Sequence, residues 1–120
     1  MRKALEYGAY GIDAADRTFA PAYLALANDA IEKASSEEEY NLLMEGPNSV
    51  VYSLESAKAA LLSAEAGLDL WEKKGDSRAF LASAKYLFHQ LVLLRDGMEK
   101  LGVGIPEELN KAIEMAEKVI

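Results

Sequence analysis

Few side chains in this 120-residue chain could do chemistry, and His89 is the only histidine among them. A general base needs an orienting carboxylate within hydrogen-bond reach, and helical spacing would place one at residues 85, 86, 92 or 93. Those positions hold Lys85, Tyr86, Val92 and Leu93, none of which is a carboxylate. Two interpretations stay open: His89 is a packed or interfacial histidine, or it centres a ligand-binding or catalytic pocket with Lys85 and Tyr86.

Metal binding lacks its usual ligands in this sequence. Di-iron helical bundles carry Glu-x-x-His pairs on two helices, whereas Tyr86 stands three residues before the single histidine. The absence of cysteine excludes disulfides and thiolate sites. Acidic residues do recur at helical spacing or in runs, as is typical of solvated helix faces: Asp13 with Asp16, Glu37 to Glu39, Glu65 with Asp69, and Asp96 with Glu99. We expect no metal or other cofactor.

The net charge of −7 argues against electrostatic binding to nucleic acid, which needs clustered lysine and arginine. The acidity lies in residues 1–46 and 105–120, whereas the segment between them is neutral. No apolar stretch approaches the roughly 18 residues of a membrane span, and Glu6 and two aspartates interrupt the N-terminal segment before any signal-like apolar run. We expect a cytoplasmic protein without a membrane or nucleic-acid partner.

Two heptad patterns dominate the middle of the chain. Apolar residues alternate at spacings of four and three from Val50 to Trp71, and again from Phe80 to Leu101. Such spacing predicts two long helices packed nearly antiparallel. Gly75 is expected to end the first helix in the left-handed conformation, and Asp76 or Ser77 to begin the second. Trp71 and Phe80 are expected to clamp the turn between them.

The flanking segments also read as helices. Pro106 with two following glutamates predicts a last helix, and Ser36 with Glu39 predicts a capped short one. The N-terminal third fits either one long helix kinked at Pro21 or two helices. The fold class is therefore all-α: one domain, residues 1–120, formed as an up-and-down bundle on a long antiparallel hairpin, residues 48–101, with flanking helices in residues 1–46 and 105–120.

Two faces of the predicted hairpin extend beyond its heptads. Small residues line one face of its first helix, Ala59, Ala60, Ser63, Ala66 and Gly67, and we expect this face to meet a terminal helix. The second helix is apolar on more than one side, which fits a central helix or half of a dimer interface. We expect its off-heptad residues to form an interface with a second copy or another protein: Tyr86, Phe88, Val92 and Leu93.

The stretch from Ala64 to Leu109 resembles the HEPN superfamily of helical bundles and a small archaeal helical family of unknown function. The matching residues are Ala64, Leu68, Gly75, Asp76, Ala79, Phe80, Ala84, Leu101 and Gly102. The resemblance implies an up-and-down bundle that often dimerises. Active HEPN ribonucleases have an arginine, then four to six intervening residues, then a histidine, and Arg78 lies too far upstream of His89 to match. The resemblance therefore implies a non-catalytic binding module. We expect the protein to be a non-enzymatic interaction or oligomerisation module.

Overall fold

The computed structural model describes all 120 residues and contains five helices and no strand. In chain order they are α1 (Arg2–Lys33), α2 (Glu37–Leu43), α3 (Glu45–Lys74), α4 (Arg78–Lys100) and α5 (Glu107–Val119). The all-α fold class predicted from the sequence is confirmed.

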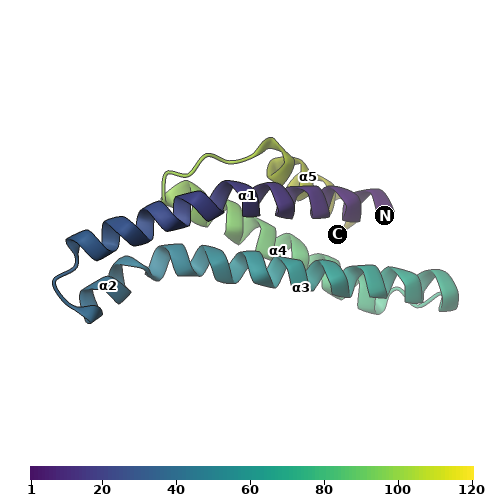
Figure 1. Ribbon diagram of the computed structural model, residues 1–120. Coiled ribbons are helices and arrows are strands. Elements are labelled where there is room, and N and C mark those ends of the chain that lie inside the picture. The colour runs from purple at the N-terminus through teal and green to yellow at the C-terminus, as the bar shows by residue number, and fades with distance from the viewer.

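Four of these helices form an up-and-down bundle, in which α3 and α4 make the central antiparallel hairpin (Figure 1). A Cβ added at Gly67 would lie 2.7 Å from the backbone nitrogen of Phe80, and one at Gly97 would lie 2.8 Å from Val50. The two helices therefore approach closely at both ends of the hairpin. On one side they are covered by α1, which runs antiparallel to α3, and by the shorter α5, which packs on α1 and α4.

The core is built from the two predicted heptads. Every heptad position is buried except Trp71 and Leu101, which are half-buried at the ends of their helices. The largest fully buried side chains include Phe19 from α1, Phe80 and Leu91 from α4, and Leu109 from α5. Helices α1, α4 and α5 therefore all contribute to one hydrophobic cluster. This burial is the main source of stability that holds the hairpin against α1 and α5.

The turn between α3 and α4 follows the sequence prediction. Gly75 has φ of 73°, the left-handed conformation that glycine adopts most readily, and it ends α3. Asp76 accepts a hydrogen bond from the backbone N–H of Arg78 at 3.1 Å, which satisfies a free donor at the start of α4. The rings of Trp71 and Phe80 lie 5.6 Å apart across the turn, so the predicted aromatic clamp is confirmed.

The N-terminal third forms one long helix, which settles the alternative left open by the sequence. Pro21 lies inside α1, on its exposed side. The hydroxyl of Ser36 accepts a hydrogen bond from the backbone N–H of Glu39 at 3.1 Å and begins α2 as predicted. The hairpin starts at Glu45 rather than at residue 48, because only Met44 separates α2 from α3.

Candidate interaction surface

The four predicted interface residues do not share one surface. Tyr86 and Leu93 are 48% and 43% exposed and lie on the same side of α4, seven residues apart. Phe88 and Val92 are half-buried and pack against the core. At 100° per residue, the second pair is rotated by roughly 130° from the first around the helix axis. Only Tyr86 and Leu93 are therefore placed together on an exposed face.

The predicted pocket residues are on the surface rather than around a cavity. Lys85 and His89 are exposed, and neither makes a hydrogen bond or an ion pair with another residue. The five main hollows of the protein surface are all lined by other residues. The geometry thus supplies no partner that would orient the imidazole ring as a base.

The contacts of α1 define which side of α3 is covered. Lys58 on α3 contacts Asp16 on α1 at 3.3 Å. Arg2 at the start of α1 pairs with Asp69 and Glu72, each at 2.8 Å. Since these positions recur along one side of α3, the opposite side of the helix is left without a neighbour from the N-terminal segment.

We call that uncovered side of the hairpin the outer face and define it by helical spacing. On α3 it comprises Ser49, Tyr52, Ser53, Ser56, Ala59, Ala60, Ser63, Ala66, Gly67 and Leu70; on α4 it comprises Ala79, Ala82, Ser83, Tyr86, Gln90, Leu93 and Gly97. None of these residues is charged, and four of them are buried: Ser53, Ala60, Gly67 and Gln90. Three charged residues continue the same sides of the helices just beyond the ends of the face: Glu45, Lys74 and Lys100. Four large side chains are exposed on this face among small ones. Tyr52 and Leu70 on α3 are 69% and 38% exposed, and they accompany Tyr86 and Leu93 on α4.

A shallow groove of about 330 Å³ lies at one end of the outer face. Gly46, Ser49 and Ser53 of α3 line one wall, and the end of α4 lines the other with Leu93, Asp96, Gly97, Lys100 and Leu101. Nearby in sequence, the Gln90 side chain is buried and its Oε1 atom has no hydrogen-bond partner within the protein. The groove therefore combines two serine hydroxyls and the apolar Leu93 and Leu101 side chains with one acidic and one basic group, Asp96 and Lys100.

One expectation about α3 is wrong. The small-residue face was expected to meet a terminal helix, but Gly67 packs instead against the backbone of α4 at Phe80. Ala59, Ser63 and Ala66 are exposed. Tyr52 and Leu70 were not among the residues predicted to form an interface, and both are exposed. The available signal was a stripe without charge from Ser49 to Leu70, on the side of the helix opposite its heptad.

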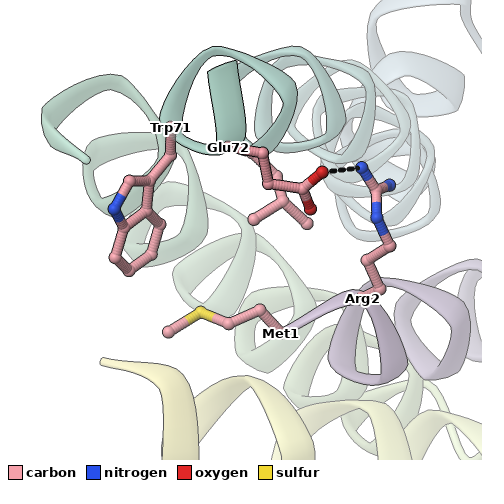
Figure 2. A pocket seen from close by; sticks show the side chains of 5 residues that line it. Met1, Arg2, Trp71 and Glu72 are labelled. Atoms are coloured by element: carbon pink, nitrogen blue, oxygen red, sulfur yellow. Dashed lines mark hydrogen bonds and ion pairs between the residues drawn. The ribbon is translucent and has the colours of Figure 1, made fainter. Parts of the chain in front are cut away.

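Another hollow, of about 420 Å³, lies where the start of α1 meets the end of α3 (Figure 2). Its lining combines Met1, Leu68 and Trp71 with the ion pair between Arg2 and Glu72. Arg2 also pairs with Asp69, so one guanidinium is shared between two carboxylates of α3. The hollow therefore lies beside the ion pairs that hold the start of α1 against the end of α3.

The carboxyl groups with shifted pKa values all take part in surface pairs away from the outer face. Hydrogen bonds from Arg2 lower the pKa of Asp69, and those from Arg78 lower the pKa of Asp76. A hydrogen bond from the Ser35 hydroxyl lowers the pKa of Glu39, while the positive charge of Lys111 lowers that of Glu114. Such shifts are typical of structural ion pairs. No three His, Asp or Glu side chains converge as a metal site requires.

Comparisons with known proteins leave the chain without a neighbour: no protein-family model, curated protein or solved structure matches it. None of the five helices combines the length and apolar character needed to cross a bilayer.

Proposed function

We propose that the protein is a non-enzymatic interaction and oligomerisation module whose binding surface is the outer face of the α3–α4 hairpin. The observation that carries the proposal is the lack of charge on this face. Charged residues make up 28% of the chain, whereas the face carries none between Ser49 and Leu70 on α3 or between Ala79 and Gly97 on α4. Depletion of charge is the compositional mark of an interface centre.

The large side chains on the face support the same proposal. Tyr52 and Tyr86 each combine an apolar ring with a hydroxyl, so they tolerate water in the free protein and bury area when a partner arrives. The small residues around them let another helix approach closely. The resemblance to non-catalytic HEPN-like bundles and the cytoplasmic location both stay predictions that agree with this role, and the alternative of a pocket at His89 has no contact in its favour.

The proposal is tested by affinity capture from extracts of the source organism with matched variants. The double variant Tyr52→Glu with Tyr86→Glu puts two charges on the outer face, whereas Tyr10→Glu with Leu24→Glu puts two on exposed positions of α1. We expect wild type and the α1 variant to retain the same bound proteins, including any untagged copies of the chain, and the outer-face variant to lose them. Equal capture by both variants would contradict the proposal.

A further inference from the structure

We infer that the outer face binds a second copy of this chain in an antiparallel arrangement, with α3 on the partner's α3 and α4 on the partner's α4. The two-fold axis lies at the level of Leu61 and Tyr86. This inference rests on the proposed function, because it names the occupant of the same face. Three features of the hairpin support the arrangement: its register, the positions of its large side chains and the charges at its two ends.

The hairpin register fixes which residues lie at the same level. Gly67 lies beside Phe80. Leu61 stands six residues before Gly67, and Tyr86 stands six residues after Phe80, so an antiparallel hairpin places Leu61 and Tyr86 at one level. The close approach of Gly97 to Val50 gives the same register at the other end.

The large residues of the outer face are arranged symmetrically about that level. On α3, Tyr52 and Leu70 each stand nine residues from Leu61, in opposite directions. A two-fold axis there places Tyr52 against the partner's Leu70 at both ends of the contact. Isologous interfaces require this kind of self-complementarity: where one residue contacts a second residue of the partner, that second residue contacts the partner's copy of the first.

The same level is the midpoint of the exposed residues on α4. Leu93 and Ala79 each stand seven residues from Tyr86, so the axis sets the large Leu93 side chain against the small Ala79 of the partner. Tyr86 meets its own copy at the centre. On α3, the central residues Ala59 and Ser63 are small and exposed, which lets the two helices approach. The residues of α3 and those of α4 therefore indicate the same level for the two-fold axis.

Two charges on α3, beyond opposite ends of the face, favour this direction of the pairing. Glu45 and Lys74 continue the outer side of α3 beyond opposite ends of the face, and neither makes an ion pair within the chain. The antiparallel arrangement brings Glu45 towards the partner's Lys74. A two-fold axis running along the helices would instead bring the two turns together, with Lys73 and Lys74 of each copy near the same residues of the other, and like charges would repel.

The size of the face fits a dimer. The stretch from Ser49 to Leu70 spans about 30 Å at 1.5 Å per residue, and two packed helices are about 20 Å wide. The resulting footprint of roughly 600 Å² approaches the ~800 Å² that each partner buries in a standard interface.

The mass of the full chain in solution, measured by sedimentation equilibrium, tests the occupant. We expect wild type to show twice the chain mass of 13.1 kDa. Ala59→Arg should weaken the dimer at least tenfold while leaving a helical monomer, because arginine favours helices and Ala59 is exposed. The matched change Ala25→Arg, at an exposed position of α1, should leave the dimer intact. Tyr86→Glu provides a second outer-face variant with the same expected loss.

Cysteine substitutions test the geometry, since the chain has no cysteine of its own. Tyr86→Cys should be joined to its own copy by a short bis-maleimide, whereas Ser49→Cys should not, because its two copies would lie about 36 Å apart along the antiparallel helices. A dimer in which Ser49→Cys is linked as readily as Tyr86→Cys would overturn the antiparallel arrangement.

The two proposals can fail separately. A monomeric wild type overturns the second-copy inference, whereas the proposed function stands if the outer-face variant still loses captured proteins of other kinds. A dimer that neither Ala59→Arg nor Tyr86→Glu weakens overturns the inference as well, because self-association would then use another surface. A dimer weakened by both, with loss of captured chains, supports both proposals.

Discussion

The inner and outer faces of the α3–α4 hairpin both lack charge, but they do so with different residues. The inner face uses leucine, phenylalanine and methionine at heptad spacing, and α1 and α5 bury it. The outer face uses serine, alanine and glycine, with four large side chains set far apart. The inner face is therefore buried by folding of the chain itself, whereas the outer face stays exposed.

A second contrast, with α1, shows why exposure by itself does not mark a binding surface. Leu24 and Ile31 on α1 are 64% and 63% exposed, about as much as Tyr52. Asn28 lies between them on the same side of α1, and the ion pair of Asp13 with Arg17 occupies that side nearer the start of the helix, so the uncharged area here is shorter than on α3. Single exposed apolar residues are normal on protein surfaces, and a continuous uncharged region is the more informative feature.

The largest expected difference between the faces is in folding stability. Phe80→Ala should lower the free energy of unfolding by about 3–5 kcal/mol, because Phe80 is fully buried and contacts Trp71. Tyr86→Ala on the outer face should change the stability of the monomer by less than about 1 kcal/mol. Urea unfolding followed by circular dichroism measures both. Similar losses for the two variants would mean that the faces are not energetically distinct.

Close packing between helices gives a smaller effect that depends on position. Gly67→Ala should cost about 1–3 kcal/mol, because the new Cβ would meet the rigid backbone of Phe80 at 2.7 Å. Gly8→Ala in α1 should instead stabilise by about 0.5–1 kcal/mol, since its Cβ would lie 3.5 Å from a Leu61 methyl group and alanine favours helices. Thermal unfolding of both variants checks the opposite signs, and a loss at both sites would contradict this packing.

Gln90 lies at the boundary between the two faces, and its replacement should raise stability. The buried Oε1 atom has no partner, so Gln90→Leu removes an unsatisfied acceptor and should raise the free energy of unfolding by about 1 kcal/mol. His89→Leu at the neighbouring exposed position serves as the control and should give no such gain. A destabilised Gln90→Leu variant would show that the amide is hydrogen-bonded in solution.

The smallest expected effect comes from the ion pairs that hold α1 on α3. Arg2 lowers the pKa of Asp69 below its ordinary value of 3.8, so the pair stabilises the folded protein above that pH. This contribution is lost as the pH falls through the lowered pKa of the folded state. Asp69→Asn should therefore flatten slightly the fall of the melting temperature between neutral pH and about pH 2. An unchanged acid limb would show that the exposed pair contributes nothing.

The parts of the fold that depend on local residues were predictable from the sequence. The two heptads, the left-handed Gly75, the Ser36 cap and the aromatic clamp all follow from spacing and residue type within a few turns of helix. The course of α1 through Pro21 was not predictable, because a proline within a helical stretch fits both a kink in one helix and the first turn of a new helix. Tertiary packing on α3 settles which one forms.

The candidate surface was predictable only in part. Tyr86 and Leu93 could be identified because they depart from the heptad of α4. Phe88 and Val92 depart from it too, and only the positions of the neighbouring helices separate the two pairs. The outer face of α3 needed the same information, since small residues fit either close packing or exposure. The sequence describes each helix face, but which faces are covered depends on the arrangement of all five helices.

The three-residue turn between α3 and α4 has a consequence for the order of folding. Closing so short a loop costs little chain entropy, whereas joining α1 to α5 brings together segments about 100 residues apart in the sequence. We expect the hairpin to form early and the terminal helices to dock late, so partial unfolding would release α1 and α5 first. The outer face would then persist in a form of the protein whose inner face is open.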